Sequence, residues 1–125
     1  MGNAVGGVVY RPLTKNPTWA AGCEREGYRD CRFGDNRAHY GSGLLTSSGS
    51  ISPFVESLMQ ELDAERIKSG GAGNKMMMLL QRSLERGDDS IASADITAKS
   101  SMLYIQDRGV LRWDTCTTEG VLMAF

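Results

Sequence analysis

The sequence predicts an α+β fold with a three-helix core, a C-terminal β-hairpin and a loosely structured N-terminal segment. In the second half of the chain, apolar residues recur at the three- and four-residue steps of a helix. Most of the irregular sequence, marked by proline turns, falls in the first half. The length of 125 residues favours one domain overall. Within it we expect an irregular segment with a short strand over 1–50, and the helical core with its hairpin over 51–125.

The N-terminal segment offers one short strand, at Val8-Val9-Tyr10. The run SGLLTSSGS at 42–50 is rich in serine and glycine and is interpreted as a linker. The Met-Gly-Asn start resembles a degraded N-myristoylation signal, because Gly6 stands in the place of the usual Ser or Thr. A flexible start is the simpler interpretation, and acylation of Gly2 stays an alternative.

The first helix is predicted over 53–68. Ser52 can accept a hydrogen bond from an unpaired N–H group at its start, and Pro53 suits the first helical position because it has no N–H to satisfy. An apolar stripe at helical spacing would face the core, and it consists of Phe54, Val55, Leu58, Met59 and Leu62.

The second helix is predicted over 75–86, between a capping Asn74 and a terminating Gly87. Methionine often simply fills a core, and we favour a core position for Met76 and Leu80. Met77 or Met78 could instead contact a partner, because methionine side chains adapt to irregular binding surfaces.

A third helix is predicted over 91–105, where apolar residues share one face, namely Ile91, Ala94, Ala98, Met102 and Ile105. Gly109 would end it in the left-handed conformation. The extended apolar pattern that follows predicts a hairpin over 110–125, with its turn at 118–120.

The order helix, helix, helix, hairpin resembles that of a winged-helix domain. The residues that carry the resemblance are 103–111, Leu-Tyr-Ile-Gln-Asp-Arg-Gly-Val-Leu, which are similar to the passage from a recognition helix into the wing of that family. The resemblance implies nucleic-acid binding through the third helix. The chain departs from the family's pattern because its second helix is long and methionine-rich, and its third carries few positive charges.

Composition narrows the function classes. Lys and Arg number 14 and Asp and Glu 15, so the net charge of −1 argues against a generally basic nucleic-acid-binding surface but allows a local basic patch. The chain has no apolar run of about 18 residues and no visible secretory signal. We therefore expect no transmembrane segment and a cytoplasmic location.

Three cysteines and one histidine are the candidate metal or redox residues. The odd cysteine count is typical of thiols in a reducing compartment, although Cys23 and Cys31 could pair. His39 follows them at the same spacing, and Cys116 could complete a zinc tetrahedron. No CxxC knuckle accompanies these residues, so neither a metal nor another cofactor is expected.

Arginines and aromatic residues are interleaved between 25 and 40, a combination that suits phosphates and unpaired bases. Acidic residues stand among them, which favours the alternative of local ion pairs on a solvated surface. The leading hypothesis is a small nucleic-acid-binding regulator. Its predicted contacts are Arg25, Arg29, Arg32, Arg37, Ser93, Thr97, Lys99, Ser100, Arg108 and Arg112.

The alternative function is that of a protein-interaction adaptor, a delivered effector or an assembly subunit. It depends on apolar faces beyond those the core needs, at the methionine run, at Ile96 with Leu103 and at 121–125. A homo-oligomer could form through the same faces. Enzymatic activity is not expected, because no nucleophile elbow, phosphate loop or dinucleotide fingerprint is present.

Overall fold

The structure is a computed structural model and describes residues 4–12, 16–33, 43–86, 102–106 and 109–125. Along these residues the strands form two small sheets of three strands each. The elements in chain order are β1 (Gly7–Arg11), β2 (Thr18–Cys23), β3 (Tyr28–Arg32), β4 (Gly43–Thr46), α1 (Pro53–Glu61), β5 (Arg66–Lys68), α2 (Ala72–Arg86), β6 (Met102–Tyr104) and α3 (Arg112–Ala124).

The first three strands form an antiparallel sheet in the order β1-β2-β3, which we call the N-terminal sheet. Gly27 takes a φ of 62° in the turn between β2 and β3, a conformation that costs glycine little. One face of this sheet packs on α2 and α3. There Ala20 joins Met77, Leu80 and Val121 in the hydrophobic core.

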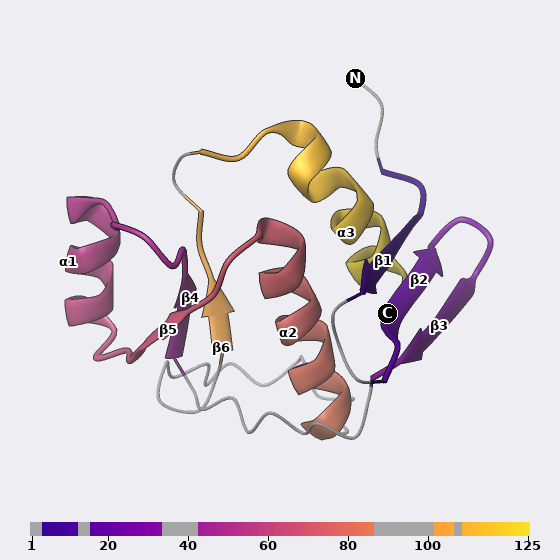
Figure 1. The fold of residues 1–125 in the computed structure, drawn as a ribbon, viewed down its shortest axis with the longest axis horizontal. Helices are drawn as coiled ribbons and strands as arrows, with labels where there is room; N and C mark the ends of the chain where they lie inside the picture. Colours follow the sequence, from indigo (N-terminus) through magenta and orange to yellow (C-terminus); the bar gives the residue numbers. More distant parts are fainter. Residues whose placement is uncertain (1–3, 13–15, 34–42, 87–101, 107–108) are drawn as a thin grey trace.

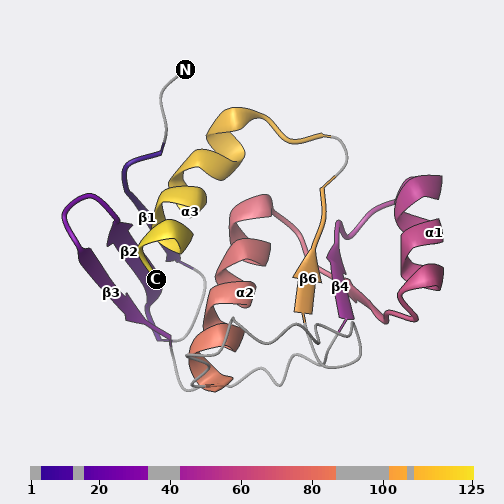
Figure 2. The same cartoon turned by 180° about the vertical axis from the view of Figure 1, so that it is seen from behind.

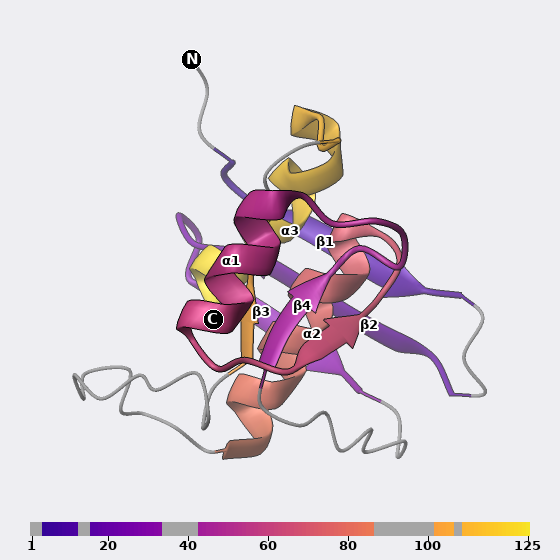
Figure 3. The same ribbon diagram turned by 90° about the vertical axis from the view of Figure 1, so that its left-hand side faces the viewer.

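The other three strands form a parallel sheet in the order β5-β4-β6. All residues of its central strand β4 are buried. Figures 1 and 2 show α1 on one face of the parallel sheet and α2 on the other, with α3 and the N-terminal sheet beyond α2. Figure 3 views the molecule from the side of α1. The two helical connections on opposite faces make this part a small doubly wound α/β unit.

Helix α3 packs on the N-terminal sheet through glycines. A Cβ atom on Gly7 would overlap the carbonyl oxygen of Thr117, and one on Gly120 would lie 2.7 Å from the backbone of Gly6. No side chain fits at either position, so the helix backbone and the strand backbone are in direct contact.

The prediction of a three-helix core with a C-terminal hairpin is wrong. The prediction of a loosely structured N-terminal segment is also wrong, because that segment forms β1, β2 and β3. Within the predicted hairpin over 110–125, residues Arg112–Ala124 form the helix α3. The N–H of Leu111 donates to the carboxylate of Asp114 over 2.8 Å, which stabilises the start of that helix. Strands scattered along the chain and a C-terminal helix also exclude the winged-helix arrangement.

The predicted third helix, over 91–105, is wrong where the structure describes it. Residues 102–104 form the strand β6, paired in parallel with β4. The remainder of that prediction, at 91–101, lies outside the described residues. Strand β6 has only three residues, and so short an apolar run fits the spacing of a helix as well as that of a strand.

The first predicted helix begins where expected. The N–H of Val55 donates to the Ser52 side chain over 3.3 Å, as a helix cap requires. The helix ends earlier than predicted, because Asp63 takes a φ of 47° and turns the chain into β5.

The methionine run belongs to the core. Met77 and Met78 are 1% and 3% exposed, so neither is available as a surface contact for a partner. Among the described residues, no helix is both long enough and apolar enough to cross a bilayer. The expectation of a single domain stays a prediction.

Candidate functional site

A crevice of about 510 Å³ lies at the carboxyl ends of β4 and β6. The chain leaves β4 toward α1 on one face of the parallel sheet and leaves β6 toward α3 on the other (Figure 1). This is the topological switch point of the sheet, where open α/β sheets bind their ligands. We call it the switch-point crevice, and it is lined by Thr46, Ser47, Ser50, Ile51, Val55, Ile105, Gln106 and Gly109.

The lining of the switch-point crevice combines polar and apolar groups. Thr46 brings a hydroxyl from the end of β4, Ser47 and Ser50 bring hydroxyls from the loop that follows, and Gln106 brings an amide from the segment after β6. The aliphatic residues Ile51, Val55 and Ile105 supply the apolar part. Small-molecule sites also combine an apolar surface with polar groups that orient the ligand, although in this crevice the polar residues outnumber the aliphatic ones.

Arg66, at the start of β5, holds the loop that forms one wall of the crevice. Its Nε donates to the hydroxyl of Thr46 over 2.9 Å. Its Nη2 donates to the carbonyls of Ser47 and Gly49 over 3.1 and 2.6 Å. The hydroxyl of Ser47 donates in turn to the carbonyl of Ser50 over 3.3 Å. A planar guanidinium that binds three loop residues fixes the shape of this wall.

A buried lysine, Lys75 of α2, lies next to Tyr104 of β6. Lys75 is 2% exposed, and its ammonium donates to the carbonyls of Ser69 and Gly71, each over 3.2 Å. The same nitrogen lies 5.4 Å from the ring centre of Tyr104. Burial lowers the pKa of Lys75, because the charged form is poorly solvated there.

Tyr104 connects this buried region to the crevice. Its hydroxyl donates to the side-chain oxygen of Gln106 over 2.7 Å, which orients the crevice amide. Burial raises the pKa of Tyr104, and the nearby negative charge of Asp114 raises it further. The tyrosine therefore stays protonated and remains a hydrogen-bond donor at neutral pH.

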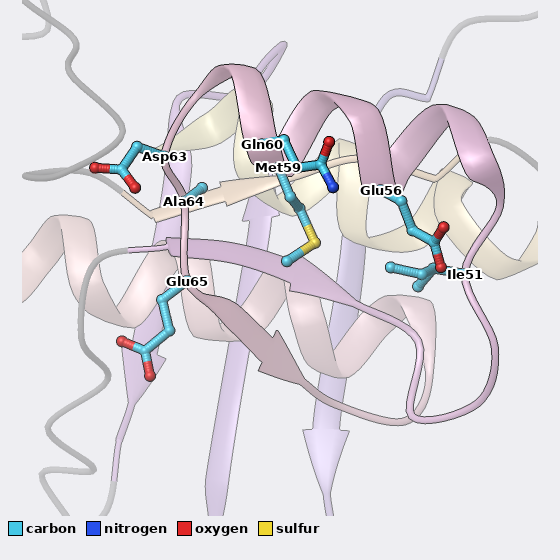
Figure 4. Close-up of a pocket in the computed structure, with 7 residues that line it drawn as sticks. All are labelled: Ile51, Glu56, Met59, Gln60, Asp63, Ala64 and Glu65. Atoms are coloured by element: carbon cyan, nitrogen blue, oxygen red, sulfur yellow. The ribbon is translucent and has the colours of Figure 1, made fainter.

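A second hollow of about 480 Å³ lies beneath α1, and we call it the α1 groove. Figure 4 shows Glu56 at one end of it and Asp63 and Glu65 at the other, with Met59 pointing into the middle. The carboxylates do not converge, and among the described residues no group of three His, Cys, Asp or Glu side chains could hold a metal ion. Negative charge at both ends would repel a phosphate.

The structure disperses the described arginines of the predicted nucleic-acid site. Arg25 lies in the turn after β2, and Arg29 and Arg32 lie on β3. Arg29 donates to the carbonyl of Phe125, next to the end of α3, over 3.1 Å. Arg112 is the first residue of α3. Because a helix rises 1.5 Å per residue, Arg112 lies about 20 Å from the end of α3 near which Arg29 binds. The other predicted contacts, Arg37, Ser93, Thr97, Lys99, Ser100 and Arg108, lie outside the described residues.

The three cysteines are thiols and form no disulfide. Residues 23 and 31 do not pair across the sheet, because Cys23 lies opposite Tyr28 and Cys31 opposite Ala20. Burial raises the pKa of Cys31, and the charge of Asp30 raises it further, so this thiol is not an activated nucleophile. His39, the remaining candidate ligand, lies outside the described residues.

Sequence reasoning missed the crevice because the run at 42–50 suggests a linker. The signal that could have found it is the buried pair Leu44-Leu45 followed by Ser47 to Ser50 and a capped helix, which is the pattern of a strand, a loop and a helix. Comparisons with known protein families, with curated proteins and with solved structures found no match.

Proposed function

We propose that the protein binds a small molecule in the switch-point crevice. The observation that carries the proposal is the coincidence of a cavity with the switch point of a parallel sheet. The volume of about 510 Å³ lies within the range of about 300–1,000 Å³ that small-molecule sites occupy. The mixed lining and the wall held by Arg66 support the same proposal.

The proposed function is binding and not catalysis. Among the described residues that line the crevice, none carries a carboxylate, thiol, imidazole or ammonium group. A serine or threonine hydroxyl needs a neighbouring base to become a nucleophile, and the described lining supplies none.

The test is nuclear magnetic resonance with a library of small molecules. Compounds that bind should shift the backbone amide signals of Ser47, Ser50, Gln106 and Gly109. Ser50→Trp should abolish these shifts, because Ser50 is exposed and lines the crevice, so an indole can fill the space. Ser48→Trp is the matched control, since Ser48 is exposed in the same loop but does not line the crevice. The proposal fails if no compound shifts these signals, or if Ser50→Trp binds as the control does.

Nucleic-acid binding stays a second proposal, supported by one feature of the N-terminal sheet. On the face turned away from α3, Tyr10 pairs with Trp19 and Trp19 with Arg32 across the three strands. Tyr10 is 56% exposed, and Tyr28 on the same face is 52% exposed. Unpaired bases stack on such rings for about 1–3 kcal/mol per base. Acidic residues offset the arginines, so stacking would supply most of the affinity.

This second proposal is tested by the fluorescence of Trp19 in a Trp113→Phe background. Single-stranded oligothymidylate at low salt should quench the emission, and Tyr10→Ala should weaken binding. Phe54→Ala is the control, because Phe54 is an exposed aromatic residue on α1, the helix beyond the parallel sheet. Absence of quenching, or equal losses in the two variants, would exclude this surface.

A further inference from the structure

Helix α1, which follows the loop after β4, has few N–H groups in its first turn that could bind a ligand. Phosphates bind at switch points largely because the N-terminus of the next helix directs N–H donors at them. At the start of α1, Pro53 has no N–H. The N–H groups of Val55 and Glu56 donate to the side chain and the carbonyl of Ser52, over 3.3 and 3.0 Å. In this first turn only Phe54 has an N–H that Ser52 does not bind.

Three described cations, Arg66, Lys68 and Lys75, lie near the strand ends, and none of them lines the crevice. Arg66 does not line the crevice, and two of its nitrogens donate to Thr46 and to the loop that forms one wall of the crevice. Lys75 donates to the carbonyls of Ser69 and Gly71 on the face of α2. The hydrogen bonds of Arg66 and Lys75 are therefore made to the protein itself, and neither side chain belongs to the described lining.

A carboxylate offsets the positive end of the α1 helix dipole. Glu56 lies in the first turn of α1, where a carboxylate neutralises the positive end of the helix dipole. The residues described as lining the crevice carry no charge of either sign.

We infer that the switch-point crevice selects uncharged ligands that carry hydroxyl or amide groups, and that it discriminates against phosphorylated ones. The inference rests on the proposed function and names its ligand class. Hydroxyls of Ser47 and Ser50 and the amide of Gln106 match neutral polar groups, while Ile51 and Ile105 cover an apolar part of the ligand. A phosphate moved from water into this neutral lining loses hydration that no cation replaces.

The experiment is a fragment screen with equal numbers of neutral, anionic and cationic compounds, with inorganic phosphate as a further probe. Binding is detected by the amide shifts of Ser47, Ser50 and Gln106. Neutral fragments should dominate the hits, and phosphate should shift none of these signals. For the best neutral hit, a phosphorylated analogue should bind at least about tenfold more weakly, which is about 1.4 kcal/mol.

The outcomes separate this inference from the proposed function. Anionic fragments that bind the crevice as often as neutral ones, or more often, would overturn the inference and leave the proposed function standing. No shift with any fragment would overturn the proposed function itself.

A charge-adding variant tests the cause of the selectivity. Ser50→Lys places an ammonium in the crevice lining, and anionic fragments should then gain affinity there. Ser48→Lys adds the same charge outside the lining and should leave the preference unchanged. If Ser50→Lys leaves anionic fragments unbound, the neutral lining is not the reason that they are excluded, and the inference is wrong.

Discussion

Replacement of Arg66 by methionine should loosen the wall of the switch-point crevice. Methionine keeps much of the length of the side chain but removes every donor. The variant loses three hydrogen bonds, one to the hydroxyl of Thr46 and two to the carbonyls of Ser47 and Gly49. The loop should remain in place less of the time, because the hydrogen bond from the Ser47 hydroxyl to the Ser50 carbonyl bridges two of its residues but does not tie the loop to β5.

The expected cost follows from these bonds. A hydrogen bond contributes a net of about 0.5–1.5 kcal/mol, and one to a charged group about 1.5–3 kcal/mol. The bond to Gly49 lies at an exposed position, where water can replace the guanidinium. We therefore expect Arg66→Met to lower the free energy of unfolding by about 2 kcal/mol, near the lower end of what three bonds allow.

Urea denaturation followed by tryptophan fluorescence measures this loss, and amide hydrogen exchange locates it. Exchange should accelerate at residues 47–50 more than in α3. Lys68→Met is the control, because Lys68 is an exposed residue of the same strand and should change stability by less than about 0.5 kcal/mol. Equal losses in the two variants, or unchanged exchange at 47–50, would refute the role given to Arg66.

Two further predictions concern packing and pH. Gly120→Ala should destabilise the protein by about 1–3 kcal/mol, because a Cβ there would lie 2.7 Å from the backbone of Gly6. Gly73→Ala should stabilise it by about 0.5–1 kcal/mol, since its Cβ would meet Thr118 at an ordinary 3.5 Å. Thermal unfolding of both variants checks the pair, and a stabilising Gly120→Ala would show that helix propensity outweighs the contact. Burial lowers the pKa of Lys75 below 10.5. Burying the charged lysine therefore costs free energy at neutral pH, and this cost disappears as the pH rises through the folded-state pKa toward 10.5, because the side chain becomes neutral. The stability of the wild type relative to Lys75→Met should therefore increase with pH over that window, by about 1.4 kcal/mol for each unit of lowering. Denaturation of both proteins across a pH series measures this difference, and a flat or falling difference would contradict the burial of the charge.

Local chemistry predicted the elements whose signals are local. The strand at 8–10 is confirmed within β1, and the cap at Ser52 before Pro53 is confirmed at the start of α1. The helix over 75–86 is confirmed within α2. Its predicted cap is wrong, because α2 begins at Ala72 and Asn74 lies inside it. Each of these signals is confined to a short stretch, so no distant partner is needed to identify it.

The last third of the chain could not be predicted in this way, because its structure depends on distant partners. Gly120 suggests a turn in isolation, yet it lies inside α3, where the helix touches Gly6 more than a hundred residues earlier. Residues 102–104 continue a helical stripe in the sequence, but in the structure they pair with β4. A parallel strand of three residues is too short to show its own period.

The candidate site was equally hidden from sequence reasoning. The residues of its two walls, within 46–51 and at 105, 106 and 109, lie on either side of α1, β5 and α2 in the chain, and they meet because β4 and β6 are neighbours in the sheet. No motif spans such a separation. The predicted arginine site stays a prediction; the structure places Arg29 and Arg32 on β3, opposite Gly22 and Trp19 of β2.

Crystals of the protein soaked with the neutral fragments test the central claim most directly. The account predicts electron density for a fragment between the loop of Ser47 and Ser50 and the side chain of Gln106, in contact with Ile51 or Ile105. Fragments that bind only in the α1 groove or on the N-terminal sheet, with the switch-point crevice filled by solvent, would contradict it.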